Sequence, residues 1–204
     1  MSNIPFQIFA WISSIFYALS LVATKLASKH SIKNPWLLNF FYMGLVFVLM
    51  VPFAVKNHAT GVPAHWNSLL WAAVFAAIAG LLFIFAVFKM DASSLGPLFN
   101  IRTVFAVLLG FLFLGERLSV LQIWLILGMI GGGVLVSLDE RLSWRTVFSL
   151  GGMFVILEML TLAIMAIFIK KSIAEIGFWQ TNFWMFLLAQ VFYCLTIPFY
   201  SSCT

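Results

Sequence analysis

Long apolar runs separated by short polar segments make up nearly the whole chain. Each run approaches or exceeds the roughly 20 residues that an α-helix needs to cross the hydrocarbon core of a bilayer. The seven runs cover about residues 4–27, 36–56, 66–89, 93–115, 119–138, 147–171 and 178–200. The short alternating segments of a membrane β-barrel are not found. The pattern therefore predicts an all-α integral membrane protein with about seven transmembrane helices.

The composition supports a lipid environment. Charged residues make up 8% of the chain and hydrophobic residues 64%, whereas soluble proteins carry about 25% charged residues. The formal net charge is +5, but the basic residues lie singly or in small groups between the apolar runs. Such residues anchor helix ends at the membrane interface. We therefore expect the lipid bilayer, and no nucleic acid, as the partner of this surface.

The sequence offers little for metal, cofactor or enzyme chemistry. Its three histidines fall in connecting segments, and its two cysteines imply no disulfide framework: His30, His58, His65, Cys194 and Cys203. No metal site and no cofactor is expected. A phosphate-binding loop of the Gly-x-x-x-x-Gly-Lys-Ser/Thr type is missing, which excludes a primary pump within this chain. An intramembrane enzyme is also disfavoured, because no histidine lies inside an apolar run.

The chain resembles itself after a shift of 145 residues. This shift places equivalent residues of the sixth run over the first, and of the seventh over the second: Phe154 over Phe9, Ala163 over Ala18, Lys170 over Lys25, and Phe192 over Phe47. Five runs separate the two starts, so the second copy would enter the membrane inverted, as in many secondary transporters. We expect residues 1–138 to form a complete five-helix repeat and residues 147–204 to begin an inverted second repeat. Three helices of that second repeat have no counterpart here, so the chain looks cut short.

Residues 91–137 carry a more specific pattern. Asp91-Ala-Ser-Ser-Leu-Gly-Pro97 leads into Leu114-Gly-Glu-Arg-Leu-Ser119, followed by the glycine-rich stretch from Gly128 to Val134. This order resembles the end of the first repeat in EamA-type transporters of the drug/metabolite transporter superfamily. The resemblance implies ten helices in two inverted halves and export of small metabolites, amino acids or drugs, and with it we expect the cytoplasmic (inner) membrane of a bacterium. Pro97, Gly115 and Glu116 would be structural, with Glu116 holding the loop after the fourth helix.

Polar residues inside the apolar runs are the candidates for substrate contact. Glu158 lies in the middle of the sixth run and Arg102 in the fourth, where charge is costly unless it faces a cavity or a partner. We hypothesise that both line one cavity, although each could instead hold two helices together. The other candidates are Ser13, Tyr17, Lys25 and Asn100. Lys25 could equally extend to the membrane interface.

Two alternatives to an active transporter remain open at the level of sequence. The chain could be a truncated fragment without transport activity, or a membrane subunit that assists the assembly of other proteins. A homodimer that rebuilds a complete cavity is a third arrangement, and it would retain transport. Only the family resemblance, and not the spacing of residues, favours transport over the first two.

Overall fold

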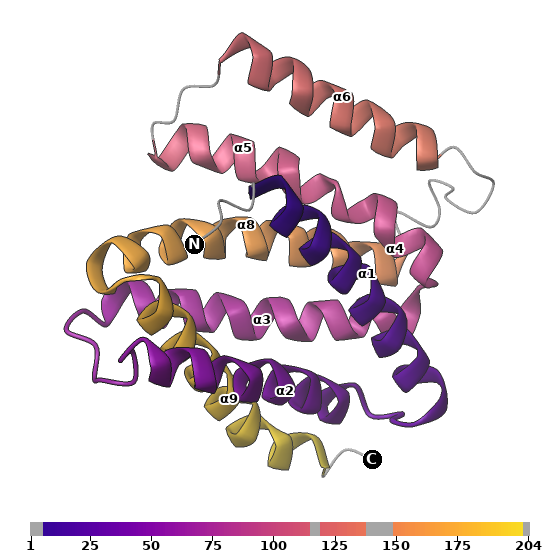
Figure 1. The fold of residues 1–204 in the computed structure, drawn as a ribbon. Coiled ribbons are helices and arrows are strands. Elements are labelled where there is room, and N and C mark those ends of the chain that lie inside the picture. The colour runs from indigo at the N-terminus through magenta and orange to yellow at the C-terminus, as the bar shows by residue number, and fades with distance from the viewer. Residues whose placement is uncertain (1–5, 115–118, 138–148, 202–204) are drawn as a thin grey trace.

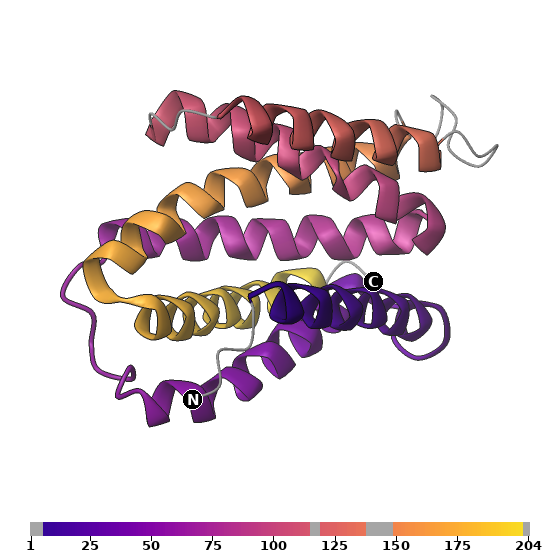
Figure 2. The same ribbon diagram turned by 45° about the horizontal axis from the view of Figure 1, so that its top comes forward.

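The computed structural model describes residues 6–114, 119–137 and 149–201. Within these residues every regular element is an α-helix, so the predicted all-α fold is confirmed. The helices in chain order are α1 (Phe6–His30), α2 (Pro35–Lys56), α3 (Asn67–Lys89), α4 (Ala92–Phe99), α5 (Ile101–Leu114), α6 (Val120–Ser137), α8 (Leu150–Ile176) and α9 (Phe178–Ser201). Figures 1 and 2 show them stacked, with α6 and α5 at one side and α2 at the other.

Among the described residues, five segments are long and apolar enough to cross a membrane. They are Ile8–His30, Pro35–Lys56, Asn67–Lys89, Ser94–Phe113 and Leu150–Ile176. The predicted spans 119–138 and 178–200 correspond to the helices α6 and α9. Large apolar side chains such as Trp11 and Phe16 are 73% and 66% exposed. Such a surface suits lipid rather than water, and the chain is an integral membrane protein.

Local sequence signals set several helix ends. The Asn34 side chain accepts hydrogen bonds from the backbone N–H of Trp36 at 2.9 Å and of Leu37 at 3.3 Å, and Pro35 begins α2. Both features are common at helix N-termini, where backbone N–H groups lack partners within the helix. At the other end of α8, Gly177 adopts φ 86°, a conformation that favours glycine. This one residue turns the chain from α8 into α9.

The core is built around α3. This helix packs against α2, α8 and α9, and its small buried residues allow close approach: Ala72, Ala73, Ala76, Ala77 and Gly80. In a bilayer, faces of small residues let helix backbones approach closely and gain dispersion contacts. The N-terminal turn of α8 approaches the end of α3 equally closely, because a methyl group at Gly151 would lie 2.5 Å from Met90 Cγ.

The predicted fourth helix is interrupted. The sequence predicted one helix over residues 93–115, whereas the structure divides it at Asn100 into α4 and α5. Pro97 lies three residues before the interruption, and proline has no backbone N–H to give to the preceding turn. The interruption is local, since Ser94–Phe113 still has the length and hydropathy of one membrane span.

The helix bounds follow the shift of 145 residues found in the sequence. Moving Phe6–His30 by this shift gives 151–175, against Leu150–Ile176 for α8. Moving Pro35–Lys56 gives 180–201, against Phe178–Ser201 for α9. In one of these two equivalent pairs, α2 and α9, the helices pack directly against each other.

Candidate substrate cavity

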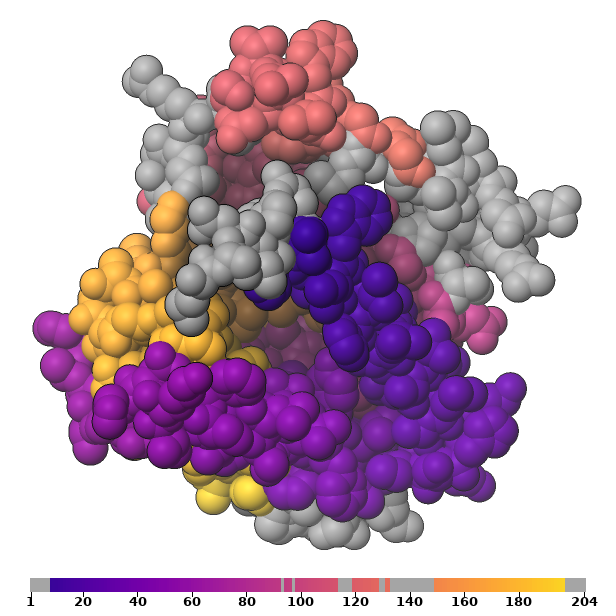
Figure 3. Space-filling view, in the orientation of Figure 1, coloured from indigo at the N-terminus to yellow at the C-terminus, as the bar shows by residue number. Residues whose placement is uncertain are grey.

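A cavity of about 200 Å³ lies inside the helix bundle. Residues from α1, α2, α3, α5, α8 and α9 line it: Tyr17, Tyr42, Met43, Ala76, Ala79, Gly80, Phe83, Arg102, Glu158, Leu162, Met165, Met185 and Phe186. The space-filling view shows the molecule hollowed between α1 and α2 (Figure 3). The lining is apolar except at one end.

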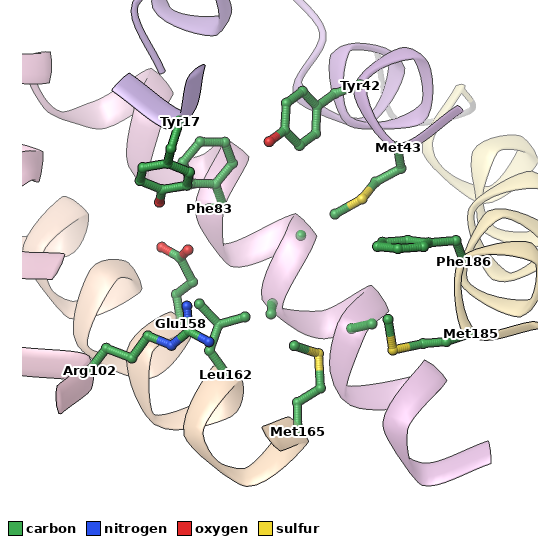
Figure 4. Close-up of a pocket in the computed structure, with 13 residues that line it drawn as sticks. Tyr17, Tyr42, Met43, Phe83, Arg102, Glu158, Leu162, Met165, Met185 and Phe186 are labelled. Atoms are coloured by element: carbon green, nitrogen blue, oxygen red, sulfur yellow. The ribbon is translucent and has the colours of Figure 1, made fainter. Parts of the chain in front are cut away.

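The polar end of the cavity brings Glu158 and Arg102 together. Glu158 is 3% exposed, and its Oε2 has no hydrogen-bond partner among the described residues. The Arg102 side chain extends from α5 toward this carboxylate, and its charge lies close enough to act on it (Figure 4). A buried carboxylate without a full set of partners is costly in lipid, so a positive charge or a proton donor would be favoured at this position.

Two tyrosines complete the polar end. Tyr17 comes from α1 and Tyr42 from α2, and both lie within electrostatic reach of Glu158. In Figure 4 the Tyr17 hydroxyl faces the Glu158 carboxylate. A series of contacting aromatic rings connects the two tyrosines. The ring centroids lie 6.1 Å apart for Tyr17 and Phe99, 6.3 Å for Phe99 and Phe83, and 5.8 Å for Phe83 and Tyr42. Edge-to-face and tilted contacts of this kind are favourable for aromatic pairs.

The opposite end of the cavity is apolar and lined by flexible side chains. Met43, Met165, Met185 and Phe186 come from α2, α8 and α9 and surround this part of the cavity (Figure 4). Methionine side chains are flexible and polarisable, so they adapt to ligands of differing shape. The cavity therefore combines one charged end with an adaptable apolar end, which suits a small amphipathic molecule.

Several predicted site residues lie away from this cavity. Ser13 is exposed on α1, and its hydroxyl donates to the carbonyl of Ala10 at 3.2 Å. Asn100 connects α4 to α5, and its carbonyl accepts from Thr103 N–H at 3.1 Å. Pro97 lies within α4. Gly115 and Glu116 fall outside the described residues.

Lys25 binds the end of another helix. Its Nζ donates to the carbonyl oxygens of Val87 at 2.7 Å and Met90 at 2.6 Å, at the C-terminus of α3. The last carbonyls of a helix lack partners within it and carry partial negative charge, so an ammonium group is stabilised there. The structure thus gives Lys25 a helix-capping position, and it is not among the cavity-lining residues.

Two notable residues, Tyr42 and Asn39, are not among those predicted from the sequence. Tyr42 lines the cavity, and Asn39 lies one turn earlier on α2, fully buried. A signal for Asn39 was available, since it is a polar residue inside an apolar run, as Glu158 is. For metal ions, the described ranges contain no group of three or more His, Cys, Asp or Glu side chains that could hold one.

A membrane-embedded helical bundle around a cavity with a charged end is the architecture of a membrane transporter. The family comparison agrees, because residues 5–138 match the EamA-like transporter family, and the chain belongs to that family. It is a membrane transporter of the drug/metabolite type, whose surroundings are lipid and whose substrate is a small molecule. Comparison with curated proteins and with solved structures gave no match.

Proposed function

We propose that this protein is a secondary transporter that exports small metabolites, amino acids or drugs across the cytoplasmic membrane of a bacterium. The observation that carries the proposal is the position of Glu158 and Arg102 on one cavity inside the bundle. Opposite charges of this kind match a solute with an ammonium and a carboxylate group. The methionine-rich end would accept the apolar part of such a solute.

Glu158 is also the group best placed to carry a coupling proton. It is buried, and the charged or titratable groups that reach it are Arg102, Tyr17 and Tyr42. A carboxyl group in lipid is far less costly when it is neutral, so a proton and a cationic solute would compete for it. Such competition would couple movement of the solute in one direction across the membrane to movement of a proton in the other.

The proposed architecture is an inverted repeat. Support comes from the helix bounds, which recur after 145 residues in α8 and α9, and from the direct packing of the equivalent pair α2 and α9. We place the first repeat in residues 1–138 and the start of the second in residues 147–204. A homodimer is a further prediction, which the mass of the detergent-solubilised particle would test.

The proposal is tested by uptake into inside-out membrane vesicles that contain the full chain. Radiolabelled amino acids and hydrophobic amines are offered with and without an imposed proton gradient. Glu158→Gln, which removes the charge at nearly the same volume, should abolish uptake. Glu175→Gln is the matched control, because Glu175 lies on the same helix, is not among the cavity-lining residues, and accepts a hydrogen bond from Ser68 at the start of α3.

The outcomes separate the rival functions. Uptake that survives Glu158→Gln would show that the solute does not pass the cavity. Absence of uptake for every solute offered would favour a subunit or fragment without transport activity of its own. Uptake that depends on Glu158 but not on the proton gradient would retain the transporter and remove the coupling role.

A further inference from the structure

A buried amide lies directly behind the wall of the cavity. Asn39 is 0% exposed, and neither Nδ2 nor Oδ1 has a hydrogen-bond partner among the described residues. An amide buried in an apolar environment without partners is unfavourable. In a membrane protein such a group is explained when another molecule supplies the hydrogen bonds in some state of its cycle.

A neighbouring hydroxyl group can satisfy only part of this amide. Tyr193 of α9 lies close enough to interact with Asn39. However, its hydroxyl donates its single proton to the carbonyl of Ala77 at 2.6 Å. Tyr193 can therefore only accept from Asn39, which would leave the amide oxygen without a donor. The amide oxygen of Asn39 therefore has no hydrogen-bond donor, whether or not its nitrogen donates to Tyr193.

The geometry around Gly80 connects Asn39 to the cavity. A methyl group at Gly80 would lie 2.6 Å from Met43 Cε and 3.3 Å from Asn39 Oδ1. Gly80 and Met43 both line the cavity, so the end of the Met43 side chain and the amide oxygen border the same small space. Met43 also follows Asn39 by four residues on α2, which puts both on one face of the helix.

We propose that Asn39 is a second polar contact of the cavity, uncovered when the Met43 side chain rotates away. An amide both donates and accepts, so its counterpart is a neutral group that does the same, such as a primary amide or a hydroxyl. This inference rests on the proposed transport function and adds a specificity-determining residue to it. It assigns the charged end of the solute to Glu158 and Arg102, and the neutral polar end to Asn39.

Cysteine labelling tests whether the cavity reaches Asn39. Cys194 and Cys203 are first replaced by serine, and Asn39→Cys is labelled in membranes with a water-soluble methanethiosulfonate. Met43→Cys serves as the cavity-lining control, and Leu45→Cys, on an exposed part of α2, as the lipid-facing control. We expect Asn39→Cys to react more slowly than Met43→Cys but at least tenfold faster than Leu45→Cys, with an increase when Met43→Ala is added.

Protection from labelling tests the ligand class. L-glutamine and L-norleucine have similar sizes and share the ammonium and carboxylate groups, but only glutamine ends in an amide. In the Cys-free protein with native Asn39, glutamine should slow labelling of Leu162→Cys at least tenfold better than norleucine. Asn39→Leu should abolish this preference.

The results separate this inference from the transport proposal. Reaction of Met43→Cys without reaction of Asn39→Cys would overturn the inference but would still support a water-accessible cavity. Failure of both to react would contradict a water-accessible cavity and with it the proposed function. Equal protection by the two amino acids, or by neither, would overturn the role of Asn39 in recognition. Asn39→Leu should leave Tm unchanged or raise it; a lower Tm would show that the amide has structural partners, and would also overturn the inference.

Discussion

The ammonium group of Lys25 lies 2.6 Å from the carbonyl oxygen of Met90, across the bundle from α1 to the end of α3. The same group also donates to the carbonyl of Val87. One side chain thus binds two backbone carbonyls at the C-terminus of the helix, where carbonyl groups lack partners within the helix. α1 is otherwise largely exposed to its surroundings. Lys25 therefore provides hydrogen bonds that connect α1 to the core.

Replacing Lys25 by methionine should destabilise the protein. Hydrogen bonds from a charged group contribute about 1.5–3 kcal/mol, and methionine keeps much of the side-chain volume but donates nothing. The thermal unfolding midpoint of the purified protein in detergent should fall by several degrees. Lys29→Met is the control, because Lys29 is exposed on the same helix. Equal midpoints for the two variants would contradict the capping role.

Removing Arg102 should be harmful only while Glu158 keeps its charge. Arg102→Gln leaves a buried carboxylate without its nearby cation, whereas the double variant Arg102→Gln/Glu158→Gln has no charge to compensate. A double-mutant cycle on the free energy of unfolding should give a coupling of about 0.5–3 kcal/mol. Additive effects of the two substitutions would mean that the two charges do not act on each other.

Replacing Gly80 by alanine should overpack the contact of α3 with α2 and α9. The added methyl group would lie 2.5 Å from Tyr193 Oη and 2.6 Å from Met43 Cε, and overpacking typically costs about 1–3 kcal/mol. Gly128→Ala in α6 is the matched control, because nothing lies within 4 Å of its added methyl group. That control should be neutral or stabilising, since alanine favours helix over glycine by about 1 kcal/mol. A Gly80→Ala midpoint as high as that of Gly128→Ala would contradict the close packing.

The fold was predictable because apolar run length is a local property. Runs of about 20 apolar residues have one stable form in lipid, and the bounds of α2 and α3 agree with the predicted runs within a few residues. The interruption at Asn100 was not predicted, although Pro97 marks it. A proline in a membrane helix can be accommodated without a break, so the sequence does not decide between the two outcomes.

The candidate site was harder to predict because it depends on contacts between distant helices. Glu158 and Arg102 stand out as charges inside apolar runs, and the structure places both on the cavity. Lys25 stands out in the same way but binds Val87 and Met90, 62 and 65 residues away along the chain. Charge at membrane depth therefore shows that a partner is needed, and only the packing shows whether that partner is a helix end or a solute.

The loop between α2 and α3 should loosen when α9 loses its contacts with Gly61. Gln180 Nε2 and Trp184 Nε1 both donate to the Gly61 carbonyl at 2.8 Å. Trp184→Phe keeps an aromatic ring against Trp66, whose centroid lies 5.4 Å away, but removes one donor. Each lost bond should cost about 0.5–1.5 kcal/mol, and Gln180→Leu combined with Trp184→Phe should cost more than either alone.

Limited proteolysis within residues 57–66 measures this loosening directly, because a protease cuts a loop faster when the loop opens more often. We expect cleavage to increase in the order native protein, single variants, double variant. Trp124→Phe on α6 is the control for loss of an indole N–H, since Trp124 is exposed and α6 lies at the opposite side of the stack from α2 (Figures 1 and 2). If Trp124→Phe accelerated cleavage as much as Trp184→Phe, the bond to Gly61 would not be what holds the loop.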